Sequence, residues 1–499
     1  MTTPLYYLAI DLGAESGRTI LGRLEGDRLE LSETHRFPNG PIRLPSSPDR
    51  YSLRWDILRL WCEIKEGIQR AVRKQGSQLA GIGIDTWGVD YGLLDRTGAL
   101  ISYPYNYRDS RTSGMLETAF RRMPRERIFE FTGIQFMPIN TLFQLLSQVV
   151  HHAPELEIAD TFLTIPDILN FWLAGRKVCE FTNATTTQCY DPRREDWSEP
   201  LLEAMGIPRR IFPEIVPPGT VLGPVSQVVA EEVGTRAPVI APACHDTGSA
   251  VAAVPAEGDN FAWISSGTWS IIGTNVDAPV INTQALKYNF TNEGGVGGSF
   301  RFSKNVMGLW LVQECRRTWA QAGQEHSYAE LTAMAASAPA LVSIIDPDYP
   351  QFLPPGDMPG RVREFCRRTG QPVPEEKGAL VRSLLEGIAL KYRLVLERLE
   401  MITGRRLETI HIVGGGSQNR LLNQLTADAT GCCVVTGPVE ATAAGNVLLQ
   451  AAALGHIETI QDGLKILQSS FELFTFEPGD RAPWDEAYGR LLDIMEKTQ

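Results

Sequence analysis

Two stretches far apart in the chain share one pattern: a β-prone run, a bend of small residues and a second β-prone run. The first starts at Tyr6 and reads YYLAIDLGAESGRTILGRL, and the second starts at Phe261 and reads FAWISSGTWSIIGTN. A glycine and a hydroxyl residue lie at each bend. A repeated unit of this kind indicates a duplicated architecture, and backbone N–H groups exposed at such a bend can bind phosphate. We therefore expect two related halves with one phosphate loop each.

The segments around these hairpins alternate between strand and helix patterns, which is typical of an α/β protein. Asp56 is a plausible N-cap for the first amphipathic helix, and Gly404 is a plausible stop for the second. A glycine triplet at 414–416 separates a strand from a further helix, an arrangement that favours nucleotide binding. We expect strands at 5–12, 79–85 and 409–413, helices at 56–74 and 378–402, and an irregular, proline-rich connection at 346–360.

Charge and cysteine content exclude several classes of protein. The 499 residues carry a formal net charge of -12, and an acidic surface repels nucleic acid and anionic membranes. The N-terminus does not resemble a signal peptide, and no apolar run is long enough to span a bilayer. The eight cysteines are scattered, without the spacing of a structural zinc site or of a disulfide framework. These features predict a cytoplasmic protein that binds neither nucleic acid nor membranes.

The first bend, Asp11 to Arg18, reads DLGAESGR. A carboxylate at a strand end can hold hydrated Mg²⁺, while the small residues expose amides to phosphate oxygens. The spacing matches neither a Walker A loop nor a dinucleotide fingerprint. The alternative is a plain strand turn with a solvated aspartate. The related bend at residues 265–268 favours the first interpretation, because two loops from two halves can clamp one polyphosphate.

A second cluster of polar side chains follows the strand that ends near Asp85. Asp85, Trp87 and Asp90 lie in IDTWGVD. Carboxylates accept hydrogen bonds from sugar hydroxyls, and an aromatic ring stacks on the apolar face of a sugar. A capped turn with a core tryptophan explains the same residues equally well. The polar stretch 107–111 either lines the same pocket or forms ion pairs at the surface.

His245, Asp246 and Thr247 follow the apolar run VIAPAC. A kinase that phosphorylates an alcohol needs a group to accept the hydroxyl proton, and Asp246 is the best candidate because a strand opens there into a predicted helix. A simple helix N-cap is the alternative role for Asp246. A serine nucleophile assisted by His245 is less favoured, because the chain lacks a nucleophile-elbow motif.

The ordered motifs resemble those of the FGGY carbohydrate kinases. The motifs are DLGAESGR, IDTWGVD, HDT, SSGTWS and VGGGSQN. A further series, RDSRT, GIQF, EFTNATTTQ, TNEGG, KNVMGLWLVQE and GPVEATAAGN, resembles more closely the members that act on L-rhamnulose. The resemblance runs from about residue 7 to residue 480. It implies two actin-like (ribonuclease H-like) α/β domains flanking a central nucleotide and sugar cleft, with the sugar side at residues 1–256 and the ATP side at residues 257–499.

The resemblance also implies the reaction and the residues that perform it. MgATP phosphorylates the C1 hydroxyl of L-rhamnulose in L-rhamnose catabolism, with Asp246 as proton acceptor and Mg²⁺ near Asp11. Contacts with ATP are implied for Ala14, Glu15, Ser16, Gly17, Arg18, Thr268, Gln313 and Gly415. Contacts with the sugar are implied for Gly88, His245, Asp246, Thr247 and Asn305. Many members have Thr or Ser where this chain has Ala14-Glu15. Since a carboxylate repels phosphate, Glu15 is expected to use only its backbone.

Three alternatives stay open at this point. The same scaffold serves kinases for L-fuculose, D-xylulose or glycerol, whose pockets differ subtly. A non-catalytic sugar sensor is less favoured, because a binder needs no base at Asp246. A chaperone-type ATPase is also disfavoured, because the TWGVD and HDT stretches suit a small substrate. A monomer or a small homo-oligomer fits the sequence equally well.

Overall fold

The computed structural model describes residues 3–76 and 78–498, which form two compact units. Unit 1 comprises the chain up to Pro255 together with Asn275–Phe302 and Ala441–Phe471. Unit 2 comprises Ala256–Thr274, Ser303–Glu440 and the residues from Glu472 onward. Each unit is thus assembled from separate segments, and the division into domains at residues 1–256 and 257–499 stays a prediction.

The main sheet of unit 1 has the strand order β13-β14-β6-β1-β2-β3. β1 and β2 form the expected antiparallel hairpin, and β1 is parallel to β6, which is parallel to β14. β13 closes this series antiparallel to β14. The strands are β1 (Leu5–Leu12), β2 (Ser16–Glu25), β3 (Arg28–Pro38), β6 (Gly81–Thr86), β13 (Thr220–Pro224) and β14 (Pro238–Ala241).

The second sheet has the strand order β17-β18-β16-β15-β19-β20-β21, and its order from β21 to β18 repeats this arrangement. β15 and β16 are the second hairpin, β15 is parallel to β19, β19 is parallel to β20, and β21 is antiparallel to β20. The repeated strand order confirms the duplicated α/β architecture that the two hairpin patterns predict. The strands are β15 (Phe261–Ser266), β16 (Trp269–Val276), β18 (Phe300–Met307), β19 (Thr409–Val413), β20 (Cys433–Thr436) and β21 (Phe474–Phe476).

The predicted helices form where their end signals place them. α1 (Ile57–Gln75) starts after Asp56, whose side chain accepts a hydrogen bond from the Arg59 N–H at 3.1 Å. α15 (Lys377–Thr403) ends at Gly404, which has a φ of 69°. The irregular connection predicted over 346–360 is wrong at its end, because α14 (Met358–Arg368) begins inside it. Asp357 caps this helix, and a proline in the first turn lacks only an N–H that has no helical partner there.

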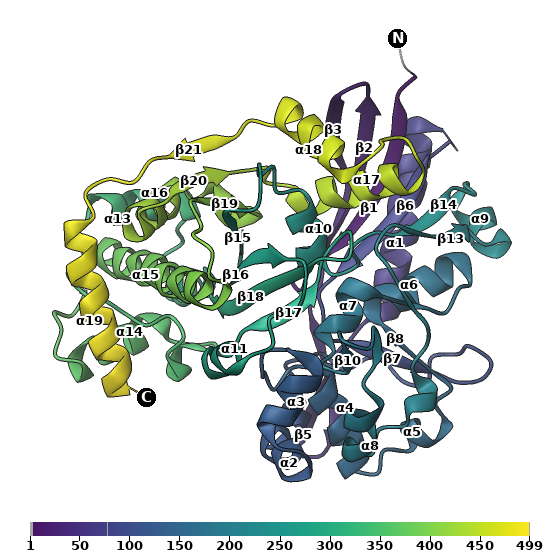
Figure 1. The fold of residues 1–499 in the computed structure, drawn as a ribbon, viewed down its shortest axis with the longest axis horizontal. Helices are drawn as coiled ribbons and strands as arrows, with labels where there is room; N and C mark the ends of the chain where they lie inside the picture. The colour runs from purple at the N-terminus through teal and green to yellow at the C-terminus, as the bar shows by residue number, and fades with distance from the viewer. Residues whose placement is uncertain (1–2, 77, 499) are drawn as a thin grey trace. The chain divides into compact units, whose positions relative to one another are not determined.

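Helix α17 (Ala441–Ala453) packs on β1 and β6 of unit 1 (Figure 1). Gly81 and Gly83 make room for it, since a Cβ on either residue would lie within 3 Å of the polar side chains of Asn446 or Gln450. Asn446 donates to the Gly83 carbonyl at 3.2 Å, and Gln450 donates to the Leu8 carbonyl at 3.2 Å. A segment late in the chain therefore completes the sheet on which the first loop sits.

The remaining elements surround these two sheets. In unit 1 the short strands are β4 (Pro41–Ser47), β5 (Arg50–Trp55), β7 (Tyr91–Leu94), β8 (Thr161–Thr164), β9 (Cys179–Glu180), β10 (Tyr190–Asp191), β11 (Asp196–Trp197), β12 (Ile215–Val216) and β17 (Thr291–Gly294). The other helices of unit 1 are α2 (Met115–Arg122), α3 (Arg125–Thr132), α4 (Thr141–Val150), α5 (Pro154–Ile158), α6 (Ile165–Ala174), α7 (Phe181–Thr186), α8 (Glu199–Met205), α9 (Gln227–Val233), α10 (Asp246–Ala252), α11 (Thr283–Tyr288) and α18 (Ile460–Ser470). Unit 2 adds α12 (Trp310–Gln321), α13 (Tyr328–Ser337), α16 (Arg420–Thr430) and α19 (Ala482–Thr498).

Over the described part of the chain, no helix combines the length and the apolar character that crossing a membrane requires. The eight cysteines are all free thiols.

Candidate active site

Three acidic side chains meet at one edge of the sheet of unit 1. Asp11 near the end of β1 lies directly opposite Asp85 near the end of β6. The Thr86 N–H donates to the Cys244 carbonyl at 2.9 Å, and Thr86 pairs in parallel register with His245. Because parallel strands end at the same edge, this pairing brings Asp246 to the edge that holds Asp11 and Asp85. Ligand sites in α/β sheets lie at that carboxyl edge.

Asp246 is the first residue of α10, and the N-cap position belongs to His245. The role of simple N-cap for Asp246 is therefore wrong. Asp246 Oδ1 accepts hydrogen bonds from the N–H of Thr247 at 2.5 Å and from its hydroxyl at 3.1 Å. The Asp246 side chain is 30% exposed. Burial and, less strongly, the charge of Asp11 raise the pKa of Asp246, while His245 lowers it. A partly exposed carboxylate with a raised pKa is suited to accept a proton.

Asp85 is fully buried beneath this edge. Its Oδ2 accepts a hydrogen bond from Asn446 Nδ2 at 2.5 Å, while no hydrogen-bond partner of Oδ1 lies among the described residues. Burial, followed by the charge of Asp11, raises the pKa of Asp85 well above its usual value. With its side chain fully buried, Asp85 is not placed to contact a sugar directly.

The side chains of Asp90 and Trp87 are buried and hydrogen-bonded within the protein rather than exposed in a pocket. Asp90 is 1% exposed, and its carboxylate accepts hydrogen bonds from four groups. These donors are Trp55 Nε1 at 2.6 Å, Trp87 Nε1 at 3.0 Å, the Tyr107 N–H at 3.1 Å and Gln144 Nε2 at 2.9 Å. Burial raises the pKa of Asp90 to about 6. Of the two interpretations of this stretch, the capped turn with a core tryptophan is therefore the correct one.

Gly88 lies in the turn between these residues and packs on the C-terminal end of α7. A Cβ at Gly88 would come within 3.1 Å of the Thr186 side chain, and the Val89 N–H donates to the Thr186 hydroxyl at 3.1 Å. Gly88 is partly exposed, so a backbone atom of Gly88 is accessible for the predicted contact with the sugar. In the neighbouring polar stretch, Arg111 donates to Gln144 at 2.6 Å, which favours an internal role for that side chain.

The first loop is held by the residue that follows β3. Asn39 donates its side-chain N–H to the Gly13 carbonyl at 2.8 Å and its backbone N–H to the Glu15 carbonyl at 2.9 Å. The Glu15 side chain is exposed. Gly17 is buried, and a Cβ there would lie 2.2 Å from the Phe37 ring. The close packing against the Phe37 ring explains why a residue without a side chain occupies position 17.

The loop also places a cation beside the first carboxylate. Arg18 Nη2 donates to Asp11 Oδ2 at 2.5 Å, and the Arg18 side chain is 20% exposed. Ala14 and Ser16 are partly exposed. The predicted phosphate contacts of residues 14–18 stay predictions, with backbone groups and one guanidinium available to make them.

In unit 2, the predicted ATP contacts lie on three segments at the end of β15. The N–H of Trp310, which begins α12, donates to the Thr268 carbonyl at 3.1 Å, and Gln313 lies in the first turn of that helix. Gly414 approaches the Ser266 backbone, where a Cβ would meet the Ser266 carbonyl oxygen at 3.0 Å. Gly415 is exposed with open space around it. The structure thus brings Thr268, Gln313 and Gly415 onto neighbouring segments. Asn305 lies on β18 in this same unit.

Two functional candidates, Glu293 on β17 and Arg301 on β18, are missed by sequence reasoning. Both are buried in unit 1, and both lie beside His245. Arg301 lies between Phe300 and Phe302 at the start of β18. A cation in such a strand is rarely buried without a partner, and this signal could have identified Arg301.

Two buried acids of unit 1, Asp167 and Glu180, predict how stability depends on pH. Burial raises the pKa of Asp167 to about 7 and that of Glu180 to about 8. Both acids therefore keep a proton in the folded chain after the unfolded chain has lost it. Their contribution to stability is full below their ordinary pKa values and falls as the pH rises through about 7 and about 8. We expect Tm to fall as the pH rises from the ordinary pKa values of these acids to about 8. Calorimetry at a series of pH values measures this fall. The variants D167N and E180Q should show a flatter profile, and an unchanged slope in both would contradict this assignment.

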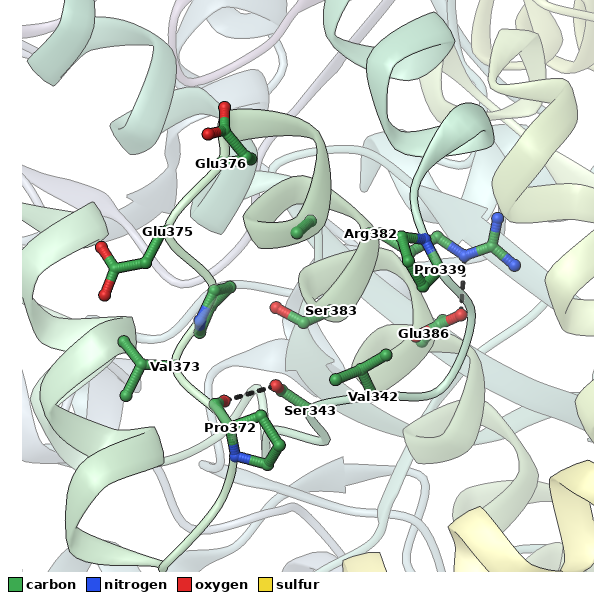
Figure 2. Close-up of a pocket in the computed structure, with 12 residues that line it drawn as sticks. Pro339, Val342, Ser343, Pro372, Val373, Glu375, Glu376, Arg382, Ser383 and Glu386 are labelled. Carbon is green, nitrogen blue, oxygen red and sulfur yellow. Dashed lines mark hydrogen bonds and ion pairs between the residues drawn. The ribbon is translucent and has the colours of Figure 1, made fainter.

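A separate cavity lies in unit 2 at the start of α15 (Figure 2). The Ser343 hydroxyl on its wall donates to the Pro372 carbonyl at 2.6 Å, and Arg382 pairs with the buried Glu386 at 2.6 Å. These side chains thus have partners within the protein. The predicted site residues are not among those lining this cavity, which are Pro339, Val342, Ser343, Pro372, Val373, Pro374, Glu375, Glu376, Ala379, Arg382, Ser383 and Glu386.

Comparison with known proteins places this geometry in a family. Residues 6–253 match the N-terminal domain, and residues 262–454 the C-terminal domain, of the FGGY family of carbohydrate kinases. A rhamnulokinase of Bacteroides thetaiotaomicron is 46% identical over 97% of this chain and 98% of its own length. A rhamnulokinase of Oceanobacillus iheyensis is 42% identical over 94% of this chain and 97% of its own.

Solved structures agree on the fold. A xylulose kinase from Lactobacillus acidophilus superposes with a TM-score of 0.81 at 17% identity, covering 99% of this chain and 98% of its own. The Plasmodium falciparum glycerol kinase with ADP gives a TM-score of 0.80 at 16% identity, with the same two coverages. At such identities the likeness concerns the actin-like, two-domain fold alone. The match of both domain models over most of the chain shows that this protein belongs to the FGGY family of carbohydrate kinases.

Proposed function

We propose that this carbohydrate kinase transfers the γ-phosphoryl group of MgATP to the C1 hydroxyl of L-rhamnulose, giving L-rhamnulose 1-phosphate and ADP. The proposed sugar rests on the near full-length identity to proteins named rhamnulokinase. The proposed chemistry rests on Asp246, a partly exposed carboxylate at the carboxyl edge of the sheet of unit 1. We place this activity in the cytoplasm and in the breakdown of L-rhamnose, and the eight free thiols fit a reducing compartment.

Asp246 acts in this mechanism as the acceptor of the C1 hydroxyl proton. Its Oδ1 is held by Thr247, so Oδ2 is the oxygen proposed to receive the proton as the oxygen–phosphorus bond forms and the bond to ADP breaks. His245, Thr247, Gly88 and Asn305 are proposed to hold the sugar. Such positioning supplies much of the rate enhancement in phosphoryl transfer, because the protein does little covalent chemistry itself.

Mg²⁺ is the proposed metal, and the residues near the first loop fit it. Asp85 Oδ1 is buried without a hydrogen-bond partner among the described residues, beside Asp11. Hard cations prefer oxygen ligands of this kind, and Mg²⁺ typically uses one or two carboxylates together with water and phosphate oxygens. Asp11 would hold the ion directly or through water, with Asp85 behind it, and the ion would offset the charge of the phosphates.

The proposed phosphate contacts come from backbone groups of residues 14–17 and from the Arg18 guanidinium. Arg18 already pairs with Asp11, so a bound nucleotide would share this cation. Thr268, Gln313 and Gly415 are proposed to contact ATP from unit 2, where the open space around Gly415 leaves room for a ligand close to the backbone.

The choice of sugar is tested by ADP production with MgATP and a panel of acceptors. We expect L-rhamnulose to stimulate ADP release strongly over the sugar-free rate, and L-fuculose, D-xylulose and glycerol to stimulate it weakly. A preference for one of the other acceptors would keep the kinase and reject this substrate. Bound ATP without stimulation by any acceptor would support a sugar sensor instead.

A further inference from the structure

A buried ion pair stands behind His245, and the phosphoryl-transfer steps above do not use it. Arg301 Nη2 lies 3.2 Å from Glu293 Oε2, and the two side chains are 1% and 8% exposed. Arg301 Nε also donates to the Gly294 carbonyl at 2.8 Å, which fixes the plane of the guanidinium. Burying two charges has a high desolvation cost, and the side chain that both charges contact is His245.

The contacts of this pair with the imidazole define which ring nitrogen carries hydrogen. Arg301 Nη2 lies 3.1 Å from His245 Nδ1 in hydrogen-bonding geometry. Glu293 Oε2 is 3.3 Å from the same nitrogen, yet within the described chain this oxygen accepts no hydrogen bond. A guanidinium can only donate. Because the hydrogen-bonding geometry at Nδ1 is met by Arg301 and not by Glu293, these contacts point to Nδ1 as an acceptor, with the hydrogen of the ring on Nε2.

We propose that Arg301, balanced by Glu293, is a positioning residue that fixes His245 as the neutral tautomer with hydrogen on Nε2. Nε2 lies 3.4 Å from Asp246 Oδ1, so its N–H is directed to the neighbourhood of Asp246, where it can donate to that carboxylate or to a sugar hydroxyl beside it. A ring that carries hydrogen on Nε2 cannot accept a proton there. His245 is thereby reserved as a donor, and Asp246 is left as the base. This inference rests on the proposed function for its role in catalysis.

The charges around His245 explain why both members of the pair are needed. Three ionisable groups face the ring: Asp246 on α10, Glu293 on β17 and Arg301 on β18. At longer range Asp11 acts on Asp246 and Glu180 acts on Arg301. Without Arg301 the ring faces two carboxylates and no cation. Asp246 also loses the attraction of that charge, and the loss of a nearby cation raises the pKa of a carboxyl group.

The tautomer is measured directly by ¹⁵N NMR on the wild-type protein without sugar or nucleotide. His245 is one of seven histidines, and its signals are assigned by their loss in H245Q. We expect Nδ1 to resonate as an unprotonated nitrogen and Nε2 as a protonated one near neutral pH. Hydrogen on Nδ1, or on both nitrogens, would overturn the proposal. This readout does not depend on which sugar the enzyme accepts, so failure of the proposed function leaves it intact.

Kinetics separate this role from a purely structural one. In R301M we expect the acid limb of the kcat/KM profile for the sugar to move up by about 1 pH unit or more, with the KM for ATP unchanged. R301K, which keeps the charge, should restore much of the wild-type profile. The double variant R301M/E293Q removes both buried charges, so that a folded protein is available even where R301M fails to fold. Its limb should lie between those of the wild type and R301M. A wild-type profile in a folded R301M, or in the double variant when R301M does not fold, would refute the positioning role.

Discussion

Replacing Asp246 by Asn is expected to lower kcat for sugar phosphorylation by about 10²–10⁴-fold, the range that general-base assistance supplies. The amide keeps the size of the side chain and can still accept the hydrogen bonds from Thr247, but it cannot take the proton from the substrate. Steady-state kinetics with MgATP and L-rhamnulose measure the loss. ATP affinity, followed by calorimetric titration, should change little, because the proposed ATP contacts lie on other residues.

The control for D246N is D428N. Asp428 on α16 accepts hydrogen bonds from Gln424 and from the Gly479 N–H and takes no part in the proposed site. D428N should retain wild-type kcat. Near wild-type turnover in D246N would remove Asp246 from the role of base.

Replacing Gly445 by Ala is expected to lower the stability of unit 1 by about 3 kcal/mol, at the upper end of the cost of overpacking. Gly445 lies where α17 crosses α10, and a Cβ there would come within 1.9 Å of the Ser249 carbonyl oxygen. Backbone atoms cannot rotate away, so the two helices must separate. Because α10 begins with Asp246, turnover should fall together with Tm, which differential scanning calorimetry measures.

The matched control for this variant is G489A in α19. Gly489 is also inside a helix, but open space surrounds the position of its Cβ. Alanine has a better helix propensity than glycine by about 1 kcal/mol, so G489A should hold or slightly raise Tm. If G445A were as stable as G489A, the close crossing of α10 and α17 would be wrong.

Much of the fold could be predicted from local patterns in the sequence. The hairpins at β1–β2 and β15–β16 and the ends of α1 and α15 follow from strand alternation, N-caps and glycine stops, which act over a few residues. Asp246 could be identified for the same reason, since an apolar run followed by a polar turn and small residues predicts a strand opening into a helix. Its neighbours on the edge, by contrast, depend on the register between Thr86 and His245, which no local pattern determines.

Polar residues in turns were harder to interpret. Asp90 has the composition of a sugar ligand, yet Trp55 and Gln144, which are distant in sequence, occupy its carboxylate. The Glu293–Arg301 pair was missed for a related reason. Both residues contact His245, which is about 50 residues away in the sequence. A charged residue in a strand does not by itself reveal such a distant partner.

The placement of α17 has a consequence for how the protein is made. This helix lies on β1 and β6, and Asn446 supplies the hydrogen bond to Asp85. A ribosome that has synthesised residues 1–440 has therefore completed β1 and β6, which carry Asp11 and Asp85, and α10, which begins with Asp246, but not the helix that covers the two strands. Until the last part of the chain emerges, one face of that sheet lacks its cover and is open to wrong partners. A chain truncated before α17 should therefore lose stability first in the sheet that contains β1 and β6, although the missing residues lie far from these strands in the sequence.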